Sequence, residues 1–424
     1  MSIPGPRSRA LAAELARYEA PGVTYLAADY PVFWARAHGA TVEDVDGNRY
    51  VDLTSAFGVA ATGHTNSHVV RAIAAQAGAL IHGMGDVHPT EVRTRLLARL
   101  AEIAPGDLCK SYLATSGAEA IEFALKTALL ATGKPRAIAY RGAYHGLSLG
   151  ALEVAGIEKF RTPFAPLVAE RATFLRYPGA ADKVSSAIGD VADTLDDDAA
   201  IGAVVVEPIQ GRGGVIVPPD GFLGALRALC DARGVLLILD EIYTGLGRTG
   251  TMFACERDGV VPDLLCIGKA LGGGVPLSAT IGTARVMDAW PASAGEALHT
   301  STFLGNPLAC AAALANLDEI ARLDLPGSVR AREATLAEGL RAMRAHAAVI
   351  DVRGRGFLWA LEFRDAASAN RAVVRGLANG VILLQSGPSG TSITIAPPLT
   401  IADDELERAL GVVDRTLAHL EEPA

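Results

Sequence analysis

Residues 235–274 read VLLILDEIYTGLGRTGTMFACERDGVVPDLLCIGKALGGG, and this stretch decides the fold. It holds two apolar runs, Val235–Leu239 and Leu264–Ile267, of the kind that forms buried strands of a parallel sheet. The first run ends in Asp240, and the second is followed after one glycine by Lys269. Because ligands bind at the carboxyl ends of parallel strands, we expect this carboxylate and this amine to meet at one edge of the sheet.

A lysine and an aspartate at one sheet edge suit pyridoxal phosphate (PLP) chemistry. The Lys269 amine can form a Schiff base, and Asp240 can keep a pyridinium nitrogen protonated so that the ring accepts electrons. A lysine at a strand end is by itself more often a surface residue whose stem lies along apolar neighbours. The aspartate and the glycines that follow, Gly272–Gly274, favour the functional interpretation.

The flanking sequence predicts a βαβ unit. A third buried strand is expected at Ala203–Ile209, and the helical spacing of Asp220–Arg233 predicts a crossover helix with an aspartate cap at its start and Gly234 at its end. Strands that alternate with helices predict an α/β fold with a large, mostly parallel mixed sheet flanked by helices.

Both ends of the chain have a different pattern. Asp46 and Gly47 form a hairpin signal, and the segments Val349–Arg353 and Ser392–Ile395 have the pattern of separate strands after a helix that begins near Pro307. We therefore expect a smaller α+β domain built from both termini. The expected division is an N-terminal segment at 1–55, a large domain at 56–310 and a C-terminal domain at 311–424.

A candidate phosphate site precedes a second helical pattern. The sequence TSGAEA at 115–120 opens a helical run that continues through Leu130, so hydroxyl and backbone N–H groups at the helix N-terminus can bind a dianion. An ordinary Ser/Thr helix cap has the same appearance when it stands alone. By contrast, the GxGxxG match at 245–250 lacks a following amphipathic helix, and Lys269 stands where a dinucleotide site needs an acidic strand end.

Composition excludes several classes of protein. The chain has 424 residues, of which half are hydrophobic, and a formal net charge of −9, which disfavours a nucleic-acid surface. The N-terminus lacks the apolar core of a signal peptide, and no run of 18 apolar residues predicts a membrane span, so we expect a cytoplasmic enzyme. Five widely spaced cysteines without a CxxC pair predict neither disulfides nor a metal site.

Over nearly its whole length the chain resembles the class III aminotransferases of fold type I, which include ornithine, acetylornithine and 4-aminobutyrate aminotransferases. The segments that carry this resemblance are TSGAEAIEFALK at 115–126, RGAYHG at 141–146, VVEPIQGRGG at 205–214, LDEIYTGLGRTG at 239–250, IGKALGGGVPLSA at 267–279 and HTSTFLGNPLAC at 299–310.

The resemblance implies a ping-pong transfer of an amino group from a small amine to a carbonyl acceptor, with pyridoxamine phosphate as the intermediate form of PLP. It also implies a homodimer with shared active sites. The residues it assigns to the cofactor are Ser116, Gly117 and Ala118 at the phosphate, Tyr144 and Ile242 on the two ring faces, Asp240 at the ring nitrogen, Lys269 as Schiff base and catalytic base, and Thr302 at the phosphate of the neighbouring subunit. Tyr243 stands where the family often has a glutamine that bonds the ring oxygen, and its hydroxyl either does the same or faces the substrate.

The substrate side departs from the family pattern. Leu147 and Thr394 stand where members that bind dicarboxylates carry arginines, and Phe57 stands where they carry a tyrosine. Leu and Thr cannot replace a guanidinium that binds a carboxylate through two hydrogen bonds. Glu207 is retained, and without the usual arginine partner we expect it to meet a substrate cation. Arg212 and Arg141 are each candidates to anchor a carboxylate, with a surface or structural role as the alternative.

These differences favour a substrate without the usual α-carboxylate recognition, such as an ω-amine, a polyamine or an aminosugar. A PLP-dependent racemase, epimerase or aminomutase of the same fold is the alternative, since these enzymes use the same lysine. The resemblance to the amino-caprolactam racemase branch fails at Arg212, where that branch carries an aspartate.

Overall fold

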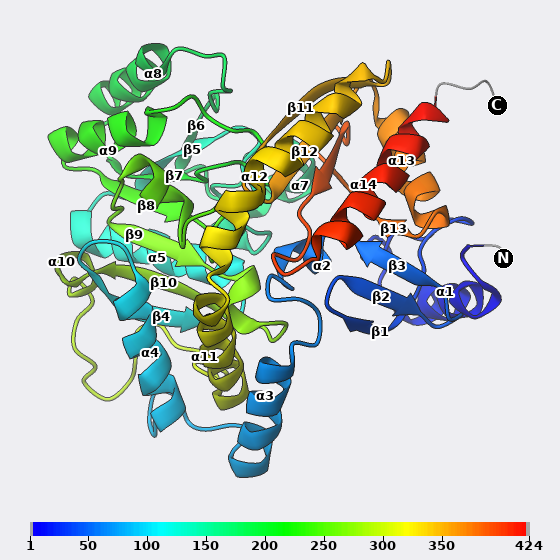
Figure 1. Ribbon diagram of the computed structural model, residues 1–424. Coiled ribbons are helices and arrows are strands. Elements are labelled where there is room, and N and C mark those ends of the chain that lie inside the picture. The colour runs from blue at the N-terminus through cyan, green and yellow to red at the C-terminus, as the bar shows by residue number, and fades with distance from the viewer. Residues whose placement is uncertain (1–2, 421–424) are drawn as a thin grey trace.

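The computed structural model describes residues 3–420 and contains three sheets (Figure 1). The largest sheet has seven strands in the order β4-β10-β9-β8-β7-β5-β6. Its strands are β4 (Leu108–Ala114), β5 (Arg136–Tyr140), β6 (Ala172–Leu175), β7 (Ile201–Val206), β8 (Leu236–Asp240), β9 (Leu264–Ile267) and β10 (Ser278–Thr283).

The seven-stranded sheet is mostly parallel. Strands β6, β5, β7, β8 and β9 pair in parallel, whereas β10 runs antiparallel to both of its neighbours, β9 and β4. The expected mixed α/β sheet is therefore confirmed. The strand expected at 203–209 ends earlier, at Val206, because the chain turns out of the sheet at Glu207.

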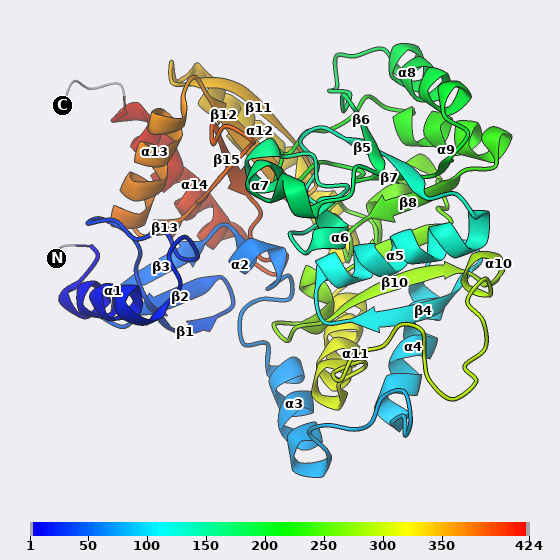
Figure 2. The ribbon, with the colours of Figure 1, turned by 180° about the vertical axis from the view of Figure 1, so that it is seen from behind.

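Helices cover both faces of this sheet, and the strand residues alternate between the two faces. Ala203 and Val205 of β7 pack in the cluster beneath α5 (Gly117–Thr132), whereas Val204 and Val206 pack in the main cluster with α8 (Val184–Asp197) and α9 (Phe222–Arg233). A parallel strand that is buried on both faces needs apolar residues throughout, which explains its continuous hydrophobic sequence. Figure 2 shows α5 lying across the sheet.

The crossover helix α9 differs from its expected start. Its N-cap is Gly221, which has no side-chain capping bond, and Asp220 instead accepts a hydrogen bond from Arg355 at 2.9 Å. Its end is as expected, because Gly234 adopts the left-handed conformation, with φ of 62°, that terminates a helix.

The remaining helices and turns of this part of the chain lie before, between or after the strands of the large sheet. They are α2 (Ser55–Gly58), α3 (Ser67–Ala79), α4 (Glu91–Ile103), α6 (Leu149–Leu152), α7 (Glu158–Arg161), α10 (Ala284–Met287) and α11 (Pro307–Arg322), with the 3₁₀ turns η1 (Thr162–Leu167), η2 (Ala254–Asp258) and η3 (Lys269–Gly272).

The two ends of the chain share a sheet. The hairpin of β2 (Thr41–Asp44) and β3 (Arg49–Asp52) turns at Gly47, as its sequence predicts, and β13 (Val381–Ile382) pairs in parallel with β3. The N-terminal elements that complete this part are α1 (Pro6–Tyr18) and β1 (Trp34–His38). Figures 1 and 2 both place α1 and α14 on the same side of the molecule.

The C-terminal part contains a sheet with the strand order β11-β12-β15-β14. Its elements are α12 (Leu325–Ala342), η4 (Met343–Ala345), β11 (Val349–Arg355), β12 (Leu358–Phe363), α13 (Ala366–Ala378), β14 (Leu384–Ser386), β15 (Ser392–Ile395) and α14 (Asp403–Ala418). The helix α11 is continuous from Pro307 to Arg322 and contacts α3 and α4. We therefore propose to end the large domain after α11 rather than at residue 310.

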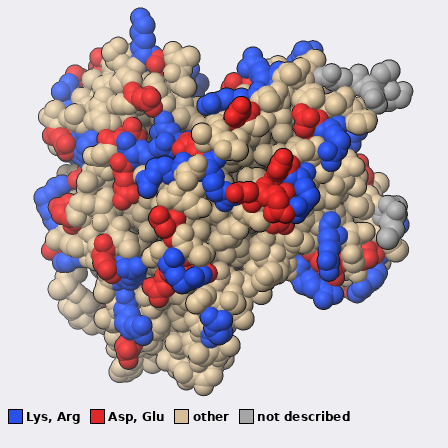
Figure 3. All heavy atoms as spheres, viewed as in Figure 1, with Lys and Arg blue, Asp and Glu red and all other residues tan. Residues whose placement is uncertain are grey.

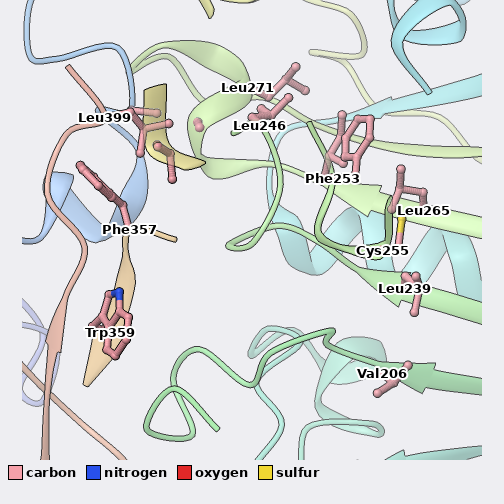
Figure 4. Close-up of a cluster of buried hydrophobic side chains, with 14 of the residues drawn as sticks. Val206, Leu239, Leu246, Phe253, Cys255, Leu265, Leu271, Phe357, Trp359 and Leu399 are labelled. Carbon is pink, nitrogen blue, oxygen red and sulfur yellow. The ribbon is translucent and has the colours of Figure 1, made fainter. Parts of the chain in front are cut away.

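One hydrophobic cluster continues from the large sheet into the C-terminal sheet. Figure 4 shows Leu239 and Leu265 of the large sheet in the same cluster as Phe357, Trp359 and Leu399 of the C-terminal part. This shared core holds the edge of the large sheet against the residues that follow β15.

The surface in Figure 3 carries interspersed acidic and basic side chains over the face shown. Within residues 3–420, no helix combines the length and the apolar character that a membrane crossing requires.

Candidate functional site

The structure brings Asp240 and Lys269 together at the carboxyl edge of the large sheet. Asp240 ends β8. Lys269 begins η3, separated only by Gly268 from β9, whose Cys266 pairs with Asp240. Lys269 has a positive φ of 39°, a strained conformation for a residue with a side chain. Burial lowers the pKa of Lys269, and the charges of Asp240 and Glu207 oppose this effect. The fold therefore presents an amine that loses its proton more readily than an exposed lysine.

Both oxygens of Asp240 have partners. Its Oδ2 lies 2.7 Å from Nδ1 of His145, and its Oδ1 accepts a hydrogen bond from the Ile242 amide at 3.0 Å. Burial lowers the pKa of His145. The hydrogen bond and the charge of Asp240 raise this pKa by more than burial lowers it, so the net shift is upward. The Nε2 of His145 is buried without a hydrogen-bond partner in the described structure. His145 thus orients the carboxylate and leaves one nitrogen available.

The start of α5 lies against the same edge. Ser116 is the N-cap, and its hydroxyl accepts a hydrogen bond from the Glu119 amide at 3.2 Å. A Cβ placed on Gly117 would lie 2.8 Å from Ile242 Cδ1, and one on Gly146 would lie 2.5 Å from the Cβ of Ala118. The glycines therefore allow the helix N-terminus to approach the residues that follow β8 and β5.

Tyr243 lies under the lysine in a narrow slot. The Nζ of Lys269 is 3.9 Å from the centroid of the Tyr243 ring. A Cβ on Gly58 would lie 2.5 Å from Tyr243 Cε2, and one on Gly211 would lie 2.4 Å from Tyr243 Cδ1. The phenol oxygen is buried without a hydrogen-bond partner in the described structure. The two glycines thus hold the ring in place, and its hydroxyl remains available to a bound molecule.

Glu207 is not free to meet a cation in the way the sequence suggested. Its Oε1 accepts a hydrogen bond from the Tyr144 amide and its Oε2 accepts one from the Gly211 amide, each at 2.9 Å. Burial raises the pKa of Glu207, and the charge of His145 opposes this effect. The carboxylate therefore joins two backbone segments, and only its remaining lone pairs can face a substrate.

Other expected substrate residues have different surroundings. Thr394 is buried in β15 and donates a hydrogen bond to the Ser386 hydroxyl at 2.7 Å. Phe57 is 63% exposed in a left-handed turn next to Gly58. Leu147 is 46% exposed. Thr394 thus fills the position of an expected arginine with a short side chain whose hydroxyl is already used.

Two further expected residues lie at the margin of the cluster. Arg212 follows Gly211 and donates a hydrogen bond to the Gln385 carbonyl at 3.2 Å. Thr302 is exposed in the loop before α11 and, within residues 3–420, makes no hydrogen bond with the residues around Lys269. Its expected contact with a neighbouring subunit stays a prediction.

Sequence reasoning missed Arg248. Its guanidinium is buried, donates hydrogen bonds to the carbonyls of Phe357 and Pro397, and lies 3.3 Å from the Ser55 hydroxyl. Burial lowers its pKa to about 10. Arg248 thereby ties the loop after β8 to both terminal parts. Arg248 lies in the GxGxxG match at 245–250, and nothing in this local pattern indicates these partners.

The cluster fits pyridoxal phosphate. Lys269 offers an amine of lowered pKa, and Asp240 offers a carboxylate held by His145. The N-terminus of α5, which begins at Gly117, offers backbone amides. The unpartnered Tyr243 hydroxyl adds a polar group beside the lysine. A fold of this type with such a site defines a PLP-dependent enzyme.

Comparison with known proteins identifies the family. The sequence model described as aminotransferase class-III matches residues 25–417. An acetylornithine aminotransferase of Methanopyrus kandleri is 42% identical over 90% of this chain and 93% of its own. A putrescine aminotransferase of Pectobacterium atrosepticum is 40% identical over 90% of this chain and 81% of its own.

A solved amine transaminase from an uncultivated Pseudomonas species, in its PLP-bound form, superposes with a TM-score of 0.88 at 31% identity, covering 95% of this chain and 99% of that one. The chain belongs to the class III aminotransferases and is a PLP-dependent enzyme.

Proposed function

We propose that this aminotransferase accepts a primary amine without an α-carboxylate, such as an ω-amine, a polyamine or an aminosugar, and transfers its amino group to a carbonyl acceptor by a ping-pong mechanism. The observation that carries this proposal is Thr394, whose buried hydroxyl is bonded to Ser386 and which cannot form the paired hydrogen bonds of a guanidinium. Exposed Leu147 supports it, because it offers no charge to a carboxylate.

The relatives support a range of amines. One relative carries the name of an N-acetylated amino acid and another that of a diamine without a carboxylate, at nearly equal identity. Family membership alone therefore does not determine which amine is the substrate. The side chains of this chain favour an amine without a carboxylate.

Each cofactor residue has a proposed role. Bound PLP supplies an electron sink for the bonds at the substrate carbon. Lys269 holds the cofactor and then moves a proton at that carbon, for which its lowered pKa is suited. Asp240, oriented by His145, pairs with the ring nitrogen. Tyr144 and Ile242 flank the ring.

The remaining polar groups complete the cofactor site in this proposal. The N-terminus of α5 binds the phosphate through Ser116, Gly117 and Ala118, because its amides and its dipole favour an anion. The buried hydroxyl of Tyr243 meets the ring oxygen.

A homodimer is part of the proposal. Thr302 lies in an exposed loop, and the apolar residues Ile81, Met84 and Phe303 are 60%, 57% and 58% exposed. Such apolar exposure is typical of a surface that another chain covers. Sedimentation of the purified protein should give twice the mass of one chain.

The test uses the holoenzyme and single amines without an acceptor. A diamine, an ω-amino compound or an aminosugar should convert the absorbance of the bound cofactor to a stable new form, and a carbonyl acceptor should restore the original. Lys269→Ala serves as the control and should show neither change. Conversion by α-amino acids alone would refute the proposed amine class, and inversion of an amine without a stable spectral change would indicate a racemase instead.

A further inference from the structure

Two cationic side chains lie beside Tyr144 without acidic partners. Lys159 belongs to the short helix α7, which Figure 2 shows between the large sheet and the C-terminal sheet. Its ammonium lies 5.0 Å from the centroid of the Phe160 ring. That ring in turn contacts the Tyr144 ring edge-on, with 5.8 Å between centroids. This chain of contacts places the Lys159 side chain near the ring of Tyr144.

Arg212 reaches the same region from the loop after β7. Glu207 accepts hydrogen bonds from the amides of both Tyr144 and Gly211, so the residue before Arg212 is held close to the backbone of Tyr144. The guanidinium of Arg212 donates one hydrogen bond, to the Gln385 carbonyl, and its other donors have no partner in the described structure. Arg212 is therefore fixed at one end and open at the other.

The two charges act on each other. Lys159 is exposed, but partial desolvation lowers its pKa, and the positive charge of Arg212 lowers it further. Neither side chain forms an ion pair within residues 3–420, although Arg227 and Arg353 in the same fold each pair with carboxylates. Like charges without a counter-ion destabilise each other, and an anion between them removes this cost.

We propose that Lys159 and Arg212 bind the carboxylate of whichever member of the substrate pair carries one, above all a 2-oxo acid acceptor. The inference rests on the proposed function. That function gives the amine substrate no carboxylate to bind, so the two cations are assigned to the carboxylate of the other substrate. Carboxylate recognition then falls to Lys159 and Arg212 rather than to the positions of Leu147 and Thr394. Arg212 supplies the planar donor pair and Lys159 the second charge.

The test compares acceptors that differ only in their acid group. In the holoenzyme, Lys159→Gln and Arg212→Gln should each raise the KM of a 2-oxo acid by about tenfold or more, because a charge-assisted hydrogen bond is lost. The KM of the matching aldehyde and the kcat with either acceptor should stay unchanged. Lys183→Gln is the matched control, since Lys183 is an exposed lysine before α8.

A binding measurement separates this inference from the proposed function. Calorimetric titration of the holoenzyme with glutarate measures its affinity for a carboxylate. This affinity should be lower in both variants than in the wild type, and unchanged in the Lys183→Gln control. Unchanged glutarate binding and unchanged KM in both variants would overturn the inference while the amine reaction persists. Loss restricted to phosphorylated acceptors would overturn its assignment to carboxylates. Failure of every amine to convert the wild-type cofactor would instead overturn the proposed function.

Discussion

The slot around Tyr243 allows a test by a single methyl group. In Gly211→Ala the new Cβ would lie 2.4 Å from Tyr243 Cδ1, whereas ordinary contacts begin at 3.4 Å. The ring must therefore yield by about 1 Å. The Tyr243 ring cannot move away from Gly211, because its other side already packs against Gly58, where a Cβ would lie 2.5 Å from Tyr243 Cε2. The φ of Gly211 lies outside the left-handed region, so packing is the main cost.

The expected cost follows from this overlap. Overpacking of a buried site costs about 1–3 kcal/mol, so denaturant unfolding of Gly211→Ala should show a free energy of unfolding lower by about 2 kcal/mol. Displacement of the ring also weakens its contact with the Lys269 nitrogen, which favours the cationic form of that nitrogen, whether as the free ammonium or as the protonated Schiff base with PLP. The pH titration of the cofactor absorbance should therefore shift to lower pH, by about one unit.

Two variants control this result. Gly189→Ala in α8 adds a Cβ where no atom lies within 4 Å, and it should stabilise the fold slightly because alanine favours a helix. Tyr243→Leu in the Gly211→Ala background removes the ring that clashes and should recover part of the lost stability. If Gly211→Ala leaves both the unfolding free energy and the titration unchanged, the ring is not held by the glycines and the reasoning fails.

Two further predictions concern buried charges. Arg248→Met leaves the carbonyls of Phe357 and Pro397 without donors, so the free energy of unfolding should fall by about 2–5 kcal/mol; urea unfolding checks this, and an unchanged midpoint contradicts it. The pKa of Glu207 is raised by burial, so the folded state holds a proton that the unfolded state releases, and stability should fall as the pH rises from about 4.5 toward neutrality. Thermal unfolding across this range should lose that slope in Glu207→Gln, and an equal slope in both proteins would refute the assignment.

Local patterns predicted much of the fold. The apolar runs that became β8 and β9, the left-handed Gly234 after α9 and the Ser116 cap of α5 each depend on residues that are neighbours in the chain. Conformational preference and burial on both faces of a parallel sheet act over such short distances. The predicted aspartate cap at the start of α9 was wrong. Asp220 accepts a hydrogen bond from Arg355, which is 135 positions away in the chain.

The sequence by itself determined the sheet edge that joins Asp240 to Lys269, since strand ends follow from hydrophobic periodicity and sheet direction. Only the tertiary structure decided what the other polar groups do. Glu207 is used by the amides of Tyr144 and Gly211, and its partner Tyr144 is 63 positions away in the chain. The reason is physical: a buried polar group takes whichever partner the packing brings within hydrogen-bond distance, and no local pattern records that partner.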